Sequence, residues 1–144
     1  MQPRDVVAIV GDNRPEWLFA ELAAQAVGGF SIGIYQDAIV EEMAYVIAFA
    51  ETRFVVVEDQ EQVDKLLEMW DQLKDHVHKV IYYDPRGLRN YTEPFLLYFP
   101  DVEKLGEAYE QDHPGAFEER VAAGRSEDIA ILCTTSGTTS KPKL

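Results

Sequence analysis

Short β-branched runs alternate along this chain with longer segments of helical periodicity, and this alternation constrains the fold more than any other feature. Strands are expected at residues 6–10, 30–35, 53–57, 77–83 and 129–133. Helices are expected from residue 15 to the Gly28-Gly29 pair and at residues 39–50, 60–74, 101–111 and 117–123. Strands alternating with helices of this length are typical of a doubly wound, mostly parallel sheet with helices on both faces. The sequence therefore predicts an α/β fold of that kind.

The first predicted helix begins with a recognisable set of residues. Pro15 suits the first helical position, and Glu16 complements the positive end of the helix dipole. Asn13 or Arg14 lies near the cap position. Because no partner base or metal cluster stands nearby in the sequence, we assign Asn13 and Glu16 to capping and not to catalysis.

The region between residues 88 and 113 is less regular and is rich in aromatic side chains. We expect these side chains to cover the core, because large exposed apolar patches are uncommon on soluble monomers. A surface that binds a partner is the alternative. They are Tyr91, Phe95, Leu96, Leu97, Tyr98 and Phe99.

Composition limits the class of protein. A chain of 144 residues with 47% apolar content can bury one sizeable core, so one domain is expected. No apolar stretch approaches the roughly 20 residues that span a bilayer. The net charge of −13 argues against nucleic acid or an anionic membrane as a partner. Cys133 is the one cysteine, which fits a reducing cytosol, and we expect it to be a buried, inert thiol within the strand at 129–133.

The last eleven residues, 134–144, follow that apolar strand and are suited to hold an anion. Gly137 allows the main chain to approach a ligand closely, and successive backbone N–H groups in such a turn form a nest for phosphate oxygens. Lys141 and Lys143 add positive charge on either side of Pro142. The segment is not a Walker loop, which needs a second glycine before Lys and Ser or Thr, and the chain contains no G-x-G-x-x-G. A plain hydroxyl-rich turn is the alternative.

The order of these residues resembles the phosphate-binding signature of the adenylate-forming synthetases, (Thr/Ser)-Ser-Gly-Thr-Thr-Gly-x-Pro-Lys-Gly. Residues 135–139, Pro142 and Lys143 match it in register, whereas Ser140 and Leu144 stand where glycine is usual. Residues 7–17 also look like a strand and an Asn-x-Pro-Glu-Trp phrase found earlier in that superfamily. The Gly-Ile-Tyr at 33–35 is similar to a stretch of long-chain acyl-CoA synthetases.

The resemblance implies a two-step reaction in an intact parent enzyme. ATP activates a carboxylic acid, here expected to be a long-chain fatty acid, to an acyl-adenylate, and coenzyme A then takes the acyl group as a thioester. Thr135 is implied as a candidate contact for Mg²⁺, and no catalytic residue is expected within the chain. The residues implied to bind the ATP phosphates are Thr135, Ser136, Gly137, Thr138, Thr139, Ser140, Lys141, Pro142 and Lys143.

The resemblance covers only part of a family member, so residues 1–144 are expected to be a fragment of the N-terminal AMP-binding domain that is inactive alone. Its exposed sheet edges invite self-association. The parent is expected in the cytoplasm, where a peripheral contact with a membrane is also compatible with the resemblance. Three alternatives stay open: adenylation of an aryl or amino acid, a non-catalytic α/β binding or assembly module, and a small phosphoryl-transfer enzyme.

Two smaller groups of polar residues receive structural interpretations. His76 and His78 stand on one face of a predicted strand, but without a third ligand they are expected to be a surface pair and not a metal site. The carboxylates of Glu58, Asp59 and Glu61 are expected to cap the helix at 60–74.

Overall fold

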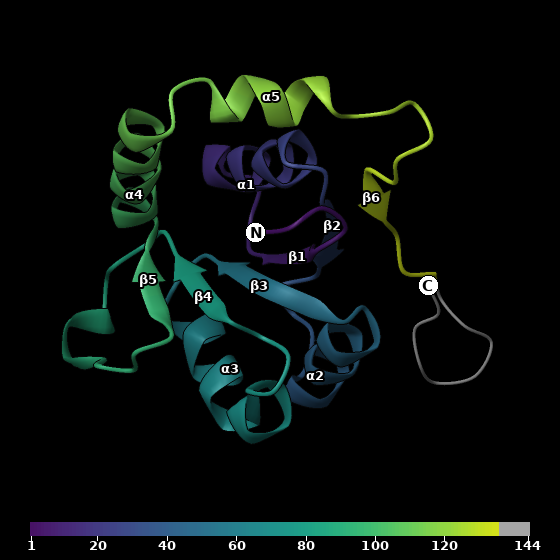
Figure 1. Ribbon diagram of the computed structural model, residues 1–144. Helices are drawn as coiled ribbons and strands as arrows, with labels where there is room; N and C mark the ends of the chain where they lie inside the picture. Colours follow the sequence, from purple (N-terminus) through teal and green to yellow (C-terminus); the bar gives the residue numbers. More distant parts are fainter. Residues whose placement is uncertain (136–144) are drawn as a thin grey trace.

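The computed structural model describes residues 1–135 and contains one six-stranded sheet in the order β5-β4-β3-β1-β2-β6. Every pairing between neighbouring strands is parallel, and Figure 1 shows the sheet at the centre of the molecule. The prediction of a parallel α/β fold is therefore confirmed. The strands are β1 (Val6–Val10), β2 (Phe30–Ile34), β3 (Thr52–Val57), β4 (Lys79–Tyr82), β5 (Leu96–Tyr98) and β6 (Ile131–Leu132).

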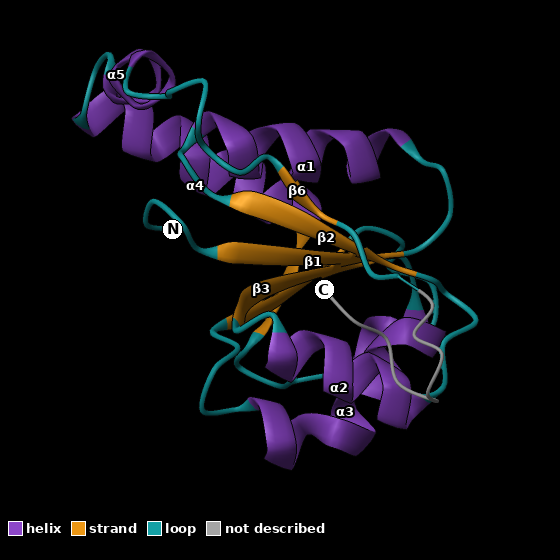
Figure 2. Ribbon diagram, turned by 90° about the vertical axis from the view of Figure 1, so that its right-hand side faces the viewer, coloured by secondary structure: helices purple, strands orange, loops and turns teal. Residues whose placement is uncertain are grey.

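Helices cover both faces of this sheet, as predicted, and Figure 2 shows the two layers above and below it. One layer consists of α2 (Val40–Phe49) and α3 (Gln60–Leu73). The other consists of α1 (Pro15–Ala26), α4 (Phe99–Asp112) and α5 (Ala116–Ala122). A short 3₁₀ turn at Leu88–Asn90 precedes β5. Within residues 1–135, none of these helices combines the length and apolar character needed to cross a bilayer.

Strand β1 is the central element, and its sequence explains its place. All five of its residues, Val-Val-Ala-Ile-Val, are buried. It pairs with β2 on one edge and with β3 on the other, and helices lie over both faces of the sheet (Figure 2). A strand buried on both faces needs a continuous apolar run and not an alternating one.

The two faces of the sheet carry unequal cores. The larger core lies under α2 and α3, where Met43, Ile47, Leu66 and Leu73 are fully buried against Val55 and other strand residues. The smaller core lies under α1, of which only Ala20 and Ala24 are buried. Helices α4 and α5 contain no buried residue. The layer of α1, α4 and α5 therefore buries few of its residues against the sheet within residues 1–135.

The aromatic region predicted to cover the core does so and also adds a strand that the sequence did not reveal. Residues 96–98 form β5, which extends the sheet beside β4. The ring of Phe95 stacks on Trp70 of α3 with their centroids 3.6 Å apart. Tyr98 stacks on Tyr82 of β4. The strand was missed because three residues are too few to show a period of two.

The last predicted strand is shorter and more exposed than expected. Strand β6 contains two residues, which pair with Ser31 and Ile32 of β2. Ile131 is 47% exposed, and Cys133 lies beyond the strand and is exposed. The prediction of a buried strand with a buried, inert thiol is wrong. Among residues 1–135, β6 has a neighbour on one side only, so its other edge faces outward.

Candidate functional site

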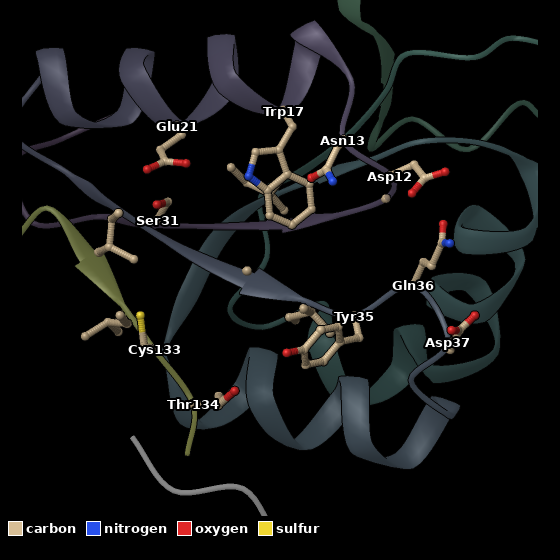
Figure 3. A pocket seen from close by; sticks show the side chains of 16 residues that line it. Asp12, Asn13, Trp17, Glu21, Ser31, Tyr35, Gln36, Asp37, Cys133 and Thr134 are labelled. Atoms are coloured by element: carbon tan, nitrogen blue, oxygen red, sulfur yellow. The ribbon is translucent and has the colours of Figure 1, made fainter. Parts of the chain in front are cut away.

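The sheet opens a crevice beyond the carboxyl ends of β1 and β2. The chain leaves β1 toward α1 on one face and leaves β2 toward α2 on the other face (Figure 2), so the two loops diverge. Ligands of doubly wound sheets bind at such points. The crevice is a cavity of about 500 Å³, shown in Figure 3. It is lined by Ile9, Gly11, Asp12, Asn13, Trp17, Glu21, Ser31, Gly33, Ile34, Tyr35, Gln36, Asp37, Ile131, Leu132, Cys133 and Thr134.

The loop after β1 forms one wall of the crevice, and it corrects an assignment made from the sequence. The N-cap of α1 is Arg14, which makes no side-chain capping hydrogen bond, and Pro15 opens the helix. Asn13 therefore does not cap α1 but lines the crevice beside Asp12. Glu16 lies in the first turn, as predicted from the helix dipole.

The loop after β2 forms the opposite wall. It contains Tyr35, Gln36 and Asp37, which Figure 3 places across the crevice from Asp12 and Asn13. The side chain of Tyr35 is 86% exposed, although the sequence had placed this residue in the strand. An exposed aromatic ring at the mouth of a cavity offers an apolar surface to a ligand.

Trp17 of α1 reaches over β2 and forms the roof of the crevice (Figure 3). Its indole lies above Gly33, where a Cβ atom would come within 3.1 Å of Cζ2 of the ring. Such a contact is tight for a side-chain atom, so glycine at this position lets the ring lie against the strand. All three residues of the Gly-Ile-Tyr stretch noted in the sequence therefore line the crevice.

The end of β6 closes the remaining side, and it leads directly to the predicted phosphate-binding segment. Leu132, Cys133 and Thr134 line the crevice, and Thr135, the next residue in the chain, is exposed. The other residues predicted to bind phosphate, 136–143, lie outside the described residues. Their binding role, and the contact of Thr135 with Mg²⁺, stay predictions.

The crevice walls carry negative charge. The carboxylates of Asp12, Glu21 and Asp37 point toward it or lie at its edge (Figure 3), while Ser31 and Asn13 add neutral polar groups. Such walls do not attract phosphate, which needs donors and cations. In the sequence, those groups follow β6, with Lys141 and Lys143. The described walls are therefore suited to a part of a ligand other than its phosphates.

No group of three or more metal-ligating side chains gathers in the part of the chain that the structure describes. His76 and His78 are both exposed, which agrees with the interpretation of a surface pair. Thr135 could supply one oxygen, and Mg²⁺ commonly takes most of its other ligands from water and substrate phosphates.

A polar cluster lies next to the crevice at the ends of β3 and β4. The carboxylate of Glu58 accepts a hydrogen bond from the backbone N–H of Asp12 at 2.7 Å. The hydroxyl of Tyr83 lies 3.5 Å from the same carboxylate, and burial, together with that negative charge, raises the pKa of Tyr83. Hydrogen bonds donated by Arg86 lower the pKa of Asp84 to about 2. Of the three carboxylates predicted to cap α3, Asp59 does so, accepting from the N–H of Gln62.

Sequence reasoning missed the loops after β1 and β2 as parts of the site. The signal that could have located them is the rule that ligands gather beyond the carboxyl ends of parallel strands. The sequence-based prediction placed a ligand only after the strand at 129–133. Residues 11–13 and 35–37 follow two other predicted strands, and their polar side chains stand at the same edge of the sheet.

The fold and the crevice define the class of protein: a doubly wound α/β protein with a ligand site at the carboxyl edge of its sheet. Comparison with protein families narrows this class. The sequence profile described as AMP-binding enzyme matches residues 1–144, the whole chain. The chain therefore belongs to the AMP-binding enzyme family.

Curated relatives agree with this assignment. The long-chain-fatty-acid–CoA ligase ACSBG2 of Xenopus laevis is 33% identical over 138 residues, which cover 95% of this chain and 18% of the relative. The long-chain-fatty-acid–CoA ligase ACSBG1 of Homo sapiens is 31% identical over 142 residues, with the same two coverages. The chain thus spans about a fifth of the length of the curated relatives it matches.

Solved structures share the fold at low sequence identity. The anthranilate CoA ligase AuaEII, solved in complex with anthranoyl-AMP, aligns with 99% of this chain and 24% of its own length at a TM-score of 0.70 and 16% identity. A luciferase-like enzyme from the mealworm Zophobas morio aligns with 99% of this chain at a TM-score of 0.62 and 15% identity, over 30% of its own length. At these identities, the likeness concerns the fold.

Proposed function

We propose that this chain is the part of an AMP-forming acyl-CoA synthetase that carries its phosphate-binding segment, and that the complete enzyme activates a long-chain fatty acid. The observation that carries the proposal is the crevice at the end of β6. Cys133 and Thr134 line it, the signature residues follow them in the sequence, and two relatives that match this chain are named long-chain-fatty-acid–CoA ligases. Membership of the AMP-binding enzyme family supports the adenylate chemistry.

In the first step, a carboxylate oxygen of the acid attacks the α-phosphorus of ATP, and the bond from that phosphorus to the bridging oxygen breaks to release pyrophosphate. In the second step, the thiol of coenzyme A attacks the acyl carbon, loses its proton, and displaces AMP. The net products are an acyl-CoA thioester, AMP and pyrophosphate. The first step needs a triphosphate held in line with the attacking oxygen, and both steps need stabilisation of the charge that develops on the leaving group.

The residues of this chain would serve the first step. Backbone amides and hydroxyls from Thr135 to Thr139 would hold the phosphate oxygens, and Lys143 would supply a cation nearby. When bound, Mg²⁺ supplies neutralisation of phosphate charge, and Thr135 is the described residue whose hydroxyl could contact it. The acidic walls of the crevice would keep the phosphates at the segment after β6 and leave the crevice to an uncharged part of a substrate.

A chain extended to the length of its relatives would test the proposal through pyrophosphate release. We expect release that depends on palmitate and that continues over many turnovers when coenzyme A is present. We also expect a loss of at least tenfold in kcat/KM for ATP in a Lys143→Ala, Thr138→Ala variant, about 1.4 kcal/mol or more of transition-state stabilisation. Release that depends on anthranilate or an amino acid, and not on palmitate, would contradict the fatty-acid substrate. An absence of release with every acid would favour a non-catalytic binding module.

The 144-residue chain offers a second test. We expect no acyl-CoA formation by this chain alone, and a thermal midpoint that rises with the concentration of Mg-ATP, because a ligand that binds only the folded state stabilises it. The same double variant should lose that rise. Acyl-CoA formation by residues 1–144 would contradict the expectation that this chain is inactive alone.

The cytoplasmic location expected from the single cysteine stays a prediction.

A further inference from the structure

The junction between β3 and α3 contacts both loops that line the crevice, although it contributes no residue to the lining. The junction runs from Glu58, directly after β3, to Lys65 in the second turn of α3. Because β3 pairs with β1, and α3 packs beside α2, this segment lies next to the loop after each of the first two strands. It therefore holds a position from which a few side chains can control the shape of the site.

Glu58 holds the loop after β1. Its Oε2 accepts the N–H of Asp12 at 2.7 Å, and its Oε1 lies 3.8 Å from Nε of Arg14. The N–H of Glu58 in turn donates to the carbonyl of Val10 at 3.1 Å, which continues the pairing of the two strands. The hydroxyl of Tyr83, the residue after β4, contacts the same carboxylate. The carboxylate thus joins Tyr83, which follows β4, to the loop that presents Asp12 and Asn13.

Gln62 and Lys65 hold the loop after β2. Nζ of Lys65 donates to the carbonyl oxygen of Gln36 at 2.7 Å, and Nε2 of Gln62 donates to the same oxygen at 3.3 Å. Gln62 is 4% exposed and the side chain of Lys65 is 18% exposed, so both donors are fixed by packing. Oε1 of Glu61 lies 3.0 Å from Nζ of Lys65, so the carboxylate balances the charge of the ammonium group. A carbonyl oxygen accepts two hydrogen bonds, and both of these come from α3.

We propose that Glu58, Gln62 and Lys65 are positioning residues, which hold the two crevice loops in the geometry that binds substrate and do not touch the substrate themselves. The role of the crevice in binding rests on the function proposed above. A site on two loops needs such supports, because a displacement of the loops by an ångström weakens every contact they make to a ligand. The supports come from one short segment, so a change there is transmitted to both walls.

Amide hydrogen exchange of the complete enzyme tests the geometry without relying on activity. In Glu58→Ala, we expect the amide of Asp12 to exchange at least tenfold faster, and in Glu58→Gln we expect protection to return, because an amide oxygen also accepts a hydrogen bond. In Lys65→Met, we expect faster exchange at Ala38, whose N–H donates to the carbonyl of Tyr35 in the loop that Lys65 holds.

Lys74→Met is the matched control, because Lys74 stands at the end of the same helix and pairs with exposed Asp71, far from both loops. It should leave exchange at both loops unchanged. Faster exchange throughout the sheet in the Glu58 and Lys65 variants would indicate a general loss of stability and would overturn the proposal. Unchanged exchange at the loops would overturn it as well.

Kinetics of the same variants tests the consequence for binding. We expect Glu58→Ala and Lys65→Met to raise KM for ATP or palmitate, the substrates of the first step, at least threefold, with a smaller change in kcat. Glu58→Gln should restore the wild-type KM. Local changes in exchange without any change in KM would overturn the positioning role. If the complete wild-type enzyme forms no adenylate, the proposed function fails, and the exchange measurements alone then decide whether these residues hold the loops.

Discussion

Gly11 lies between β1 and the crevice, and its conformation depends on the absence of a side chain. Its φ of 155° is unusual for L-residues, and a Cβ atom would collide with the hydroxyl of Tyr83 and lie 2.9 Å from Cβ of Glu58. The close approach lets Glu58 reach the N–H of Asp12. One small residue therefore allows the polar cluster to form beside the site.

Gly11→Ala should destabilise the fold by about 1–3 kcal/mol, because alanine is strained at this φ and its Cβ meets the hydroxyl of Tyr83 and the Cβ of Glu58. Chemical denaturation of the two proteins would measure the difference in the free energy of unfolding. Gly106→Ala is the control: its added Cβ meets nothing within 4 Å on α4, so it should be neutral or stabilise by up to about 1 kcal/mol. Equal changes in the free energy of unfolding for the two substitutions would show that the position of Gly11 does not specifically require the absence of a side chain.

Asp84 should make the stability of the fold depend on acid pH. Its ordinary pKa of 3.8 is lowered to about 2 in the folded chain, first by the side-chain hydrogen bonds from Arg86. A group with a lowered pKa stabilises the folded state above its unfolded pKa and loses that contribution as the pH falls through the folded value. The contribution is therefore present at pH 7 and lost between about pH 4 and pH 2.

Asp84→Asn should cost about 1 kcal/mol at pH 7, since solvent around the exposed guanidinium of Arg86 screens the pair. The difference from the wild-type chain should shrink toward pH 2. Denaturant titrations at pH 7, 4 and 2.5 would follow it. A difference that stays constant over this range would show that the substitution acts through packing and not through charge.

The polar residues beside the site show where prediction from sequence is limited. Three carboxylates near residue 60 were expected to cap a helix, and Asp59 does so because capping depends on neighbours within three residues. Glu58 instead accepts a bond from Asp12, 46 positions earlier in the chain. Asn13 likewise lines the crevice and does not cap α1. No feature of the neighbouring sequence distinguishes a residue that caps a helix from one that contacts a distant loop or lines the crevice.

At the scale of elements, α3 and α4 have the same length but different relations to the core. Helix α3 buries Val63, Leu66, Met69 and Leu73 along one face, whereas α4 has no buried residue. The apolar spacing of 3.6 residues that predicts a helix is present in both, but only tertiary packing determines how completely the apolar face is covered.

Leu66→Ala should destabilise the fold by about 2–5 kcal/mol, because Leu66 is 0% exposed and its removal leaves a cavity in the larger core. Leu105→Ala on α4 should change the free energy of unfolding by less than about 0.5 kcal/mol, because that side chain is 60% exposed. Thermal or denaturant unfolding would compare the pair. A comparable loss in Leu105→Ala would mean that α4 is buried by contacts beyond those of residues 1–135.

At the scale of the whole molecule, the layer of α1, α4 and α5 exposes many large apolar side chains. Large exposed apolar patches on soluble proteins favour association. The two-residue strand β6 adds an open sheet edge among the described residues. The exposed side chains of this layer are Leu18, Phe19, Leu22, Leu105, Tyr109, Phe117 and Val121.

The 144-residue chain should therefore self-associate at concentrations between about 1 μM and 1 mM. Phe19→Lys combined with Leu22→Lys should shift it toward the monomer, because both side chains are about half exposed on α1. Ile39→Lys, an equally apolar and exposed position before α2 on the opposite face, should have little effect. Sedimentation velocity over this range would decide, and a wild-type chain that stays monomeric throughout would contradict the expectation.

The order of the elements, their parallel pairing and the helices on both faces could be predicted from the sequence. These features follow from periodicity, turn residues and connection lengths, which act over a few neighbouring residues. The family could also be inferred from the residues at 135–143, although most of that segment lies outside the described residues. Its phosphate-binding role stays a prediction.

Only the tertiary structure decided which loops meet and which side chains are covered. The crevice exists because β1 and β2 are neighbours whose chains leave toward opposite faces, and strand neighbours are set by contacts between distant residues. The same contacts bring Glu58 and Lys65 to two loops that precede them by many residues. They also leave Cys133 exposed beside an open edge, although its apolar neighbours had predicted burial. A local sequence pattern determines what a segment can form, whereas its partners depend on the packing of the whole chain.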